Sequence, residues 1–377
     1  MKLLTSALAI VLTAIAITGC MQDNGKSTAN GGAADKASGD ASFEQAIIEN
    51  IAQNVIVATY RDLRDATQAV ADAASLLQKS PTQANLDNVQ AKWKLARIPW
   101  ESNEGFLFGP VSNVDKQIDV WPLSKIDLDR ILAGRTEFSA DFIRNIDPSV
   151  KGFHTAEYLI FGDGVTTNTK TIAQMTPAQI NYLVSVTRVV AEETQRLYMA
   201  WTEKFDPSDA SSTSYLSILQ THNDSHYATR QDVLREYVEG MKGIAVEVGS
   251  GKLSTPLGGD IGAADGSLVE SQFSWNSLSD FQDNIHSMQH VYTGDYNGRS
   301  GPGIDELVKL RNSTLDKKIV AQMNDALAAI SDIAGPEGLS FTLAIKNPAA
   351  RIRTEKAIAV CKTLEQTLET ELLPMFQ

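Results

Sequence analysis

Apolar residues recur at helical spacing along most of the chain. Between residues 43 and 77, Ile47, Ile51 and Val55 are followed by further apolar positions at intervals of three or four, and neither Gly nor Pro interrupts them. A period near 3.6 predicts one long amphipathic helix. The alternation with period two that would indicate β-strands is absent from the sequence.

Three Pro residues follow a side chain that can cap a helix, which is typical of a helix start. They lie in Ser80-Pro81, Asp147-Pro148 and Thr176-Pro177. Further helical patterns cover about 226–248, 276–293, 303–334 and 347–373. Ser274 or Asn276 is expected to cap the helix over 276–293. The pattern therefore predicts an all-α protein.

Two breaks rich in Gly and Ser divide the helical patterns, near 206–214 and 249–267. We take the first break as a domain boundary, which gives an N-terminal helical bundle over 43–208 and a C-terminal bundle over 209–377. The expected architecture is two tandem bundles, each resembling a four-helix bundle, that form one compact body.

The N-terminus has a different character. Residues 1–19 contain one Lys, an apolar stretch and small residues before Cys20, which is typical of a secretory signal peptide. The ending Ile17-Thr18-Gly19-Cys20 resembles a bacterial lipobox, which implies cleavage before Cys20 and lipidation of its thiol. Residues 20–42, mostly Gly, Ala, Ser and Asp, predict a flexible linker. We expect a lipid-anchored protein of the bacterial cell envelope that faces the periplasm.

Met21 follows the Cys in place of the Asp that retains enteric lipoproteins in the inner membrane, which favours the outer membrane.

The composition excludes several classes of partner and of site. Lys and Arg number 33 against 46 Asp and Glu, for a net charge of −13, which argues against nucleic acid as a partner. The two cysteines exclude a disulfide framework and a cysteine-built zinc site, and Cys361 is expected to be a buried structural thiol.

The most informative chemistry lies at His154 and Glu157, which are three residues apart and share a helix face. An imidazole and a carboxylate so placed suit a divalent metal ion or ferric iron. They also suit a pair in which Glu157 only orients the His154 ring, or a buried histidine satisfied by its neighbour. Gly152 would allow another backbone or a ligand to approach closely.

Two further carboxylates, Glu101 and Glu104, share a helix face, and Asp119 follows in a predicted loop. Glu104 is a candidate ligand, while Glu101, Asp119 and the neighbouring Trp100 are candidates for the ligand's surroundings. A histidine with several carboxylates suits iron better than a zinc hydrolase, and the H-E-x-x-H motif of zinc peptidases is absent from the sequence. The alternative is that Glu101 and Glu104 form a solvated face.

Segment 152–162, which reads G-x-H-x-x-E followed by Tyr-Leu-Ile-Phe-Gly, resembles the signature of imelysin-like proteins, a bacterial family of secreted or membrane-anchored helical proteins. Segments 96–110 and 118–122 resemble the same family. Segments 255–257, 270–277 and 291–294 resemble its iron-regulated branch. The resemblance implies two helical bundles with the G-x-H-x-x-E helix near their junction.

The resemblance also implies a role in iron uptake for many members, whereas others are classed as metallopeptidases. We therefore expect a protein that binds a metal ion, most readily iron, or an iron-containing ligand, and that serves iron acquisition with an uptake receptor or transporter as partner. The alternative is a metallopeptidase with zinc at His154 and Glu157 as ligand or base. Two histidine pairs at spacing i, i+4 remain unassigned: His222 with His226, and His286 with His290.

Overall fold

The computed structural model describes residues 31–222 and 225–377. The chain divides into two compact units, Met1–Ala41 and Ser42–Gln377. The predicted signal peptide and Cys20 lie outside the described residues. Helix α1 (Gly31–Asn50) begins inside the stretch 20–42 that we predict as a flexible linker, so the structure departs from that prediction from residue 31 onward.

The long N-terminal helix is confirmed. Helix α1 continues through a π-helical turn, η1 (Ile51–Ile56), into α2 (Val57–Lys79). Helix α3 (Gln83–Glu101) begins after the predicted Ser80-Pro81 start because Thr82 caps it, accepting a hydrogen bond from the Asn85 N–H. Thr176 and Pro177 begin α8 (Pro177–Thr202) as predicted, with a capping box formed by Thr176 and Gln179.

Short elements connect α3 to α8. They are η2 (Glu104–Phe106), α4 (Val111–Ile118), α5 (Lys125–Gly134), α6 (Ala140–Arg144), η3 (Pro148–Val150), α7 (Gly152–Ile160) and η4 (Ile172–Gln174). Asp147 caps η3 rather than a longer helix, and α7 begins separately at Gly152. The sequence motif around His154 therefore forms a short helix of its own.

The second half of the chain is also helical. Its elements are α9 (Tyr215–Thr221), α10 (Arg230–Val246), η5 (Glu247–Leu253), α11 (Ser254–Leu257), η6 (Gly266–Leu268), α12 (Ser277–Thr293), α13 (Ile304–Arg311), α14 (Ser313–Asp332), α15 (Phe341–Ala344), α16 (Pro348–Thr367), η7 (Leu368–Leu372) and η8 (Leu373–Phe376). Asn312 divides the single helix predicted over 303–334 because it caps α14. The described residues contain no β-strand, which confirms the all-α class.

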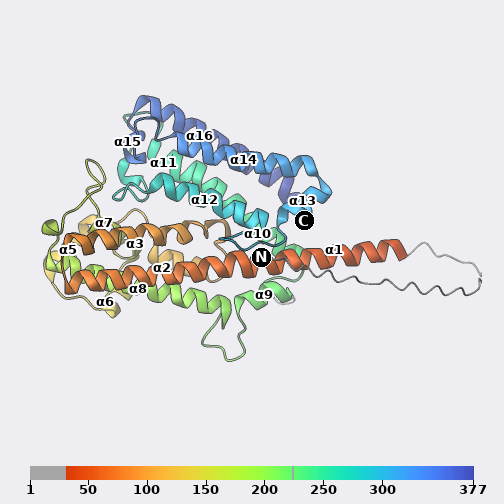
Figure 1. The fold of residues 1–377 in the computed structure, drawn as a ribbon, viewed down its shortest axis with the longest axis horizontal. Helices are drawn as coiled ribbons and strands as arrows, with labels where there is room; N and C mark the ends of the chain where they lie inside the picture. Colours follow the sequence, from red (N-terminus) through yellow and green to blue (C-terminus); the bar gives the residue numbers. More distant parts are fainter. Residues whose placement is uncertain (1–30, 223–224) are drawn as a thin grey trace, which may run out of the picture. The chain divides into compact units, whose positions relative to one another are not determined.

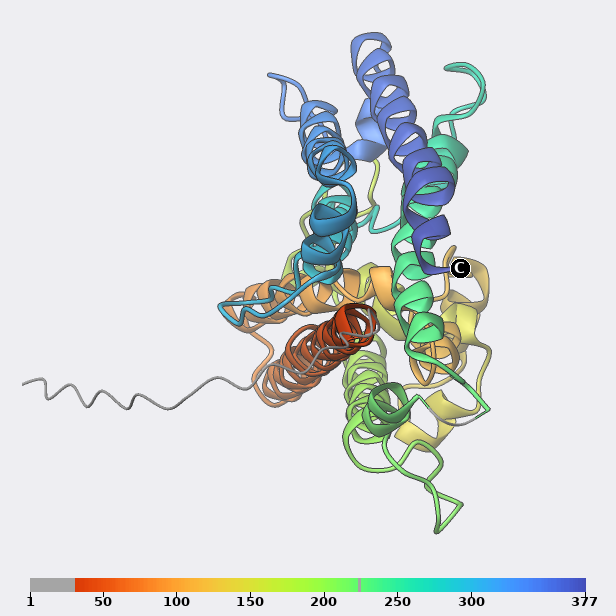
Figure 2. The same ribbon diagram turned by 90° about the vertical axis from the view of Figure 1, so that its right-hand side faces the viewer.

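Two groups of helices build the unit Ser42–Gln377. In one group α2 packs between α3 and α8, and in the other α14 packs against α16 and α12 (Figures 1 and 2). Helix α12 also contacts α3, and both α10 and α12 contact η2, so the two groups join along α3 and η2.

The boundary predicted at 208/209 falls in the exposed loop between α8 and α9, although α9 still packs against α8 and η1. No helix in the part of the chain that the structure describes is long and apolar enough to cross a membrane. Cys361 is buried, and burial raises the pKa of its thiol to about 12.

Candidate metal centre

A close backbone contact positions the first part of the site. Gly152 begins α7 with a φ of +86°, and a Cβ atom at this position would lie 2.1 Å from the Ile118 carbonyl oxygen. Only glycine tolerates both the conformation and the contact. The end of α4 therefore lies against the first turn of α7, which brings Asp119 to His154.

His154 and Glu157 are both buried and face each other across one turn of α7. His154 Nδ1 lies 3.3 Å from Glu157 Oε2. The other oxygen, Glu157 Oε1, accepts hydrogen bonds from the Ser274 N–H (2.8 Å) and the Ser274 hydroxyl (2.7 Å). Trp121 packs on the imidazole with ring centroids 4.7 Å apart. These contacts fix the ring and direct its other nitrogen, Nε2, away from Glu157.

Two carboxylates lie beyond His154 Nε2. Asp119 Oδ1 is 3.3 Å away and Glu270 Oε1 is 3.8 Å away. His154 is 1% exposed, and its Nε2 makes no well-directed hydrogen bond to any described residue. Asp119, His154 and Glu270 each offer a ligand atom, and these atoms lie within 4.8 Å of one another. We call this group the histidine cluster.

Burial and neighbouring charges shift the pKa values of His154 and Asp119 in the histidine cluster. Burial by itself lowers the pKa of His154, but the charge of Asp119 and the polar contacts with Asp119 and Glu157 outweigh it and raise the pKa to about 10. Burial raises the pKa of Asp119, but the charges of Arg97 and His154 hold it well below its usual value. A metal ion at Nε2 would have to displace the imidazole proton.

A second group of possible ligands shares Asp119. Glu104, Asp115 and Asp119 also bring one carboxylate oxygen each within 4.8 Å of one another, and we call them the carboxylate cluster. Glu104 is 5% exposed, and its Oε2 has no hydrogen-bond partner among the described residues. Burial raises the pKa of Glu104 well above its usual value, and burial together with the charge of Asp119 raises that of Asp115 to about 6.

A buried arginine holds the acidic groups together. Arg97 is fully buried, and its guanidinium donates to Asp119 Oδ1 at 2.6 Å and to Glu270 Oε1 at 3.0 Å. It also donates to Glu101, one helical turn along α3, and lies 3.4 Å from Asp280 Oδ2. One cation thus contacts four buried carboxylates.

Lys252 and Asn284 complete this network. Lys252 Nζ lies 3.2 Å from Glu101 Oε2 and 3.0 Å from Glu270 Oε2. Asn284 donates to Glu101 Oε2 at 2.6 Å. Trp100 donates its indole N–H to Asp119 Oδ2 at 2.7 Å. Glu101 is therefore part of the supporting network, and Trp100 orients a shared carboxylate.

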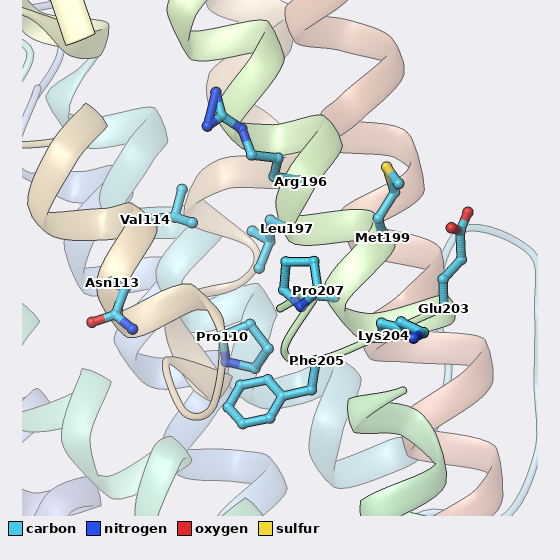
Figure 3. Close-up of a pocket in the computed structure, with 11 residues that line it drawn as sticks. Pro110, Asn113, Val114, Arg196, Leu197, Met199, Glu203, Lys204, Phe205 and Pro207 are labelled. Carbon is cyan, nitrogen blue, oxygen red and sulfur yellow. The ribbon is translucent and has the colours of Figure 1, made fainter. Parts of the chain in front are cut away.

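The two clusters border a cavity of about 380 Å³, which we call the acidic cavity. Its lining comprises Glu104, Leu107, Asp115, Asp119, Trp121, Pro122, Glu247, Gly251, Lys252, Thr255, Leu268 and Glu270. A second cavity, of about 360 Å³, lies between α4 and α8. Figure 3 shows Val114, Leu197, Phe205 and Pro207 around it, and we call it the apolar cavity.

The structure thus gathers most of the residues that we predict for the site. His154 belongs to one cluster, Glu104 to the other, and Asp119 to both. Glu157 instead turns both oxygens toward His154 and Ser274. Gly152 provides the predicted close approach, and its partner is the backbone of Ile118.

The two histidine pairs lie apart from both clusters. His222 Nε2 contacts Gln45 Oε1 at 2.9 Å, and the His226 ring packs against Phe205 and Tyr215. The rings of His286 and His290 stack 6.4 Å apart. Neither pair belongs to a group of three possible ligands within the described residues.

Sequence reasoning missed Glu270 as a possible ligand and Arg97, Lys252 and Ser274 as supporting residues. Three of them, Arg97, Glu270 and Ser274, lie in segments that resemble the imelysin-like family. That resemblance is the feature of the sequence that could have pointed to them. Lys252 lies in the predicted break 249–267, but η5 continues α10 through a π-helical turn there. That turn presents Lys252 to the acidic cavity.

Comparison with known proteins agrees with this architecture. The model of the imelysin family (peptidase M75) matches residues 56–368. Iron-regulated protein A of Synechococcus elongatus is 26% identical over 335 residues, which cover 88% of this chain and 86% of that protein.

Two crystal structures share the fold. One, from Parabacteroides distasonis and assigned as an iron-regulated protein A precursor, has a TM-score of 0.75 and 27% identity, and the match covers 88% of this chain and 95% of that one. The other, an imelysin-like protein from Psychrobacter arcticum, has a TM-score of 0.69 and 12% identity, with 89% and 96% covered. At that identity the second likeness concerns the fold alone.

Proposed function

The chain belongs to the imelysin family, and we propose that it binds iron at the histidine cluster as a lipid-anchored envelope protein serving iron acquisition. The observation that carries the proposal is the buried His154 Nε2, which makes no well-directed hydrogen bond to any described residue and lies 3.3 Å from Asp119 Oδ1 and 3.8 Å from Glu270 Oε1. A buried polar atom that is poorly hydrogen-bonded destabilises the folded chain, so a ligand that completes its coordination gains free energy.

The chemistry of the donors favours iron. An imidazole nitrogen with two carboxylates is a donor set that suits iron. Glu157 takes the role of the carboxylate that orients a metal-binding histidine through its Nδ1–H. Ser274 in turn fixes Glu157.

The biological setting rests on two further supports. A relative and a structural neighbour carry the name iron-regulated protein A, which favours a role in iron metabolism. The lipobox-like sequence before Cys20 favours anchoring by lipid with the protein facing the periplasm, and Met21 favours the outer membrane. An iron-uptake receptor or transporter in the same envelope would be the partner.

Hydrolysis receives less support from the geometry. A metallopeptidase needs a carboxylate that is free to take a proton from a metal-bound water. Glu157, the predicted base, has one oxygen bonded to Ser274 and the other directed at His154. We therefore propose a binding protein rather than a peptidase.

The test is anaerobic calorimetric titration of the full chain, purified in detergent, with Fe²⁺. We expect His154→Ala to weaken binding about 100-fold, since it removes the only nitrogen ligand of the histidine cluster. His290→Ala is the matched control, and it should bind Fe²⁺ like the unaltered protein. Equal binding by His154→Ala would overturn the proposal. Chelator-sensitive cleavage of unfolded casein that is lost in His154→Ala would support the peptidase instead.

A further inference from the structure

We propose that the acidic cavity holds two cations side by side, with Asp119 as the carboxylate they share. His154 and Glu270 complete the first position, and Glu104 and Asp115 complete the second. This inference rests on the proposed function, because the first position is the proposed iron site. It adds a second position with ligands of its own.

The sharing of Asp119 is the first support. Asp119 is the one residue common to both clusters. A carboxylate has about four lone pairs, and here Arg97 uses one on Oδ1 and Trp100 uses one on Oδ2. His154 Nε2 also contacts Oδ1 at 3.3 Å, a contact that a metal ion bound to Nε2 would replace. Each oxygen therefore retains capacity for a cation. Carboxylates that bridge two metal ions typically hold them about 3.5–4 Å apart.

The second support is that each cluster contains its own unsatisfied buried atom. In the carboxylate cluster it is Glu104 Oε2, which has no hydrogen-bond partner in the described part of the chain. In the histidine cluster it is His154 Nε2, whose contacts with Asp119 and Glu270 are not well-directed hydrogen bonds. Glu104 is 95% buried and lines the acidic cavity. A single ion at His154 would leave Glu104 without a partner, because the two residues belong to different clusters.

Charge gives the third support. Among the residues that line the acidic cavity, the carboxylates are Glu104, Asp115, Asp119, Glu247 and Glu270, and the single cation is Lys252. Arg97 lies behind this lining and already contacts two of these carboxylates. Carboxylates crowded in low dielectric repel one another strongly, and a second cation offsets repulsion that the first leaves in place.

The donors also specify the chemical class of the second cation. Glu104, Asp115 and Asp119 supply oxygen only, which suits a hard cation such as Mn²⁺, Mg²⁺ or iron. The position at His154 includes nitrogen and suits iron or another transition metal. Mn²⁺ can occupy both kinds of site, which makes it a suitable probe.

The experiment counts Mn²⁺ bound to the full chain in detergent by equilibrium dialysis and metal analysis. We expect two ions for the unaltered protein and one for Glu104→Gln. Asp115→Asn gives a second route to the same loss at a position that is only half-buried. Glu203→Gln, at the apolar cavity, is the control and should bind two.

Electron paramagnetic resonance adds a readout that a merely structural role of Glu104 would not change. Two Mn²⁺ ions about 4 Å apart couple magnetically, so the unaltered protein should give a broadened spectrum. Glu104→Gln should give the sharp six-line signal of an isolated ion.

The outcomes separate the two proposals. One ion in the unaltered protein, unchanged by Glu104→Gln, would overturn the second position and leave the proposed function intact. Two ions in both proteins would overturn the assignment to Glu104. No bound Mn²⁺ in any protein would overturn the second position, and the proposed function itself would be overturned if the Fe²⁺ titration also showed no binding.

Discussion

The acidic cavity and the apolar cavity differ in chemistry although their volumes are nearly equal, about 380 and 360 Å³. Around the apolar cavity, side chains such as Val114, Leu197 and Phe205 have no hydrogen-bonding demand (Figure 3). In the lining of the acidic cavity, Glu104 holds a buried oxygen, Oε2, that has no hydrogen-bond partner in the part of the chain that the structure describes. The comparison teaches that buried polar atoms lacking hydrogen-bond partners, rather than the volume of a cavity, indicate a candidate binding site.

The same difference appears in energetic terms. Bringing carboxylates and a guanidinium out of water costs several kcal/mol per ion, and apolar residues of similar volume would avoid this cost. Proteins tend to retain such destabilising buried charges where function requires them. The acidic cavity is therefore expected to be sensitive to single substitutions, and the apolar cavity is expected to tolerate them.

The largest expected effect concerns Arg97. Arg97→Leu removes the cation that contacts four buried carboxylates, and we expect a loss of about 3–5 kcal/mol in the free energy of unfolding. Urea unfolding followed by circular dichroism, with chelator present, measures this loss. Arg188→Leu is the matched control, because Arg188 is 69% exposed and its ion pair with Glu192 should contribute less than about 1 kcal/mol. Equal unfolding midpoints for the two variants would remove the energetic contrast between the cavities.

A smaller effect is expected at Gly152. Gly152→Ala combines a positive φ with a Cβ atom 2.1 Å from the Ile118 oxygen, so we expect a loss of about 2 kcal/mol. Fe²⁺ binding should weaken as well, since α4 and α7 can no longer hold Asp119 against His154.

Gly243→Ala, on α10, is the control for Gly152→Ala. A Cβ atom there meets nothing within 4 Å, and the change should stabilise the helix by about 0.5–1 kcal/mol. Differential scanning calorimetry and Fe²⁺ titration measure both variants. Unchanged Fe²⁺ affinity in a destabilised Gly152→Ala would show that the close backbone contact serves folding alone.

The helices were largely predictable because periodicity and caps are local signals. The long N-terminal helix and the start of α8 at Thr176-Pro177 follow directly from them. The observed helix boundaries differ from the predicted ones where another residue caps the helix. Thr82 replaces Ser80 as a cap, and Asn312 divides the helix predicted over 303–334.

The site was predictable only in part. The spacing of His154 and Glu157 is visible in the sequence because both lie on one short helix. Glu270 and Lys252 are about a hundred residues further along, and helical periodicity does not specify which distant segment will face α7. The folded chain assigns Glu270 to the histidine cluster and directs Glu157 to an orienting role.

The smallest expected effect uses two adjacent residues of α4 that line different cavities. Val114 lines the apolar cavity and Asp115 lines the acidic cavity. Val114→Ala should cost about 1 kcal/mol and leave Mn²⁺ binding unchanged, because it only enlarges a space already lined by apolar groups. Asp115→Asn should leave stability unchanged or raise it, since it removes a half-buried charge that neighbouring carboxylates repel, while it abolishes binding of the second Mn²⁺. Loss of Mn²⁺ in Val114→Ala would mean that the two cavities are coupled through α4, and the contrast between them would then fail.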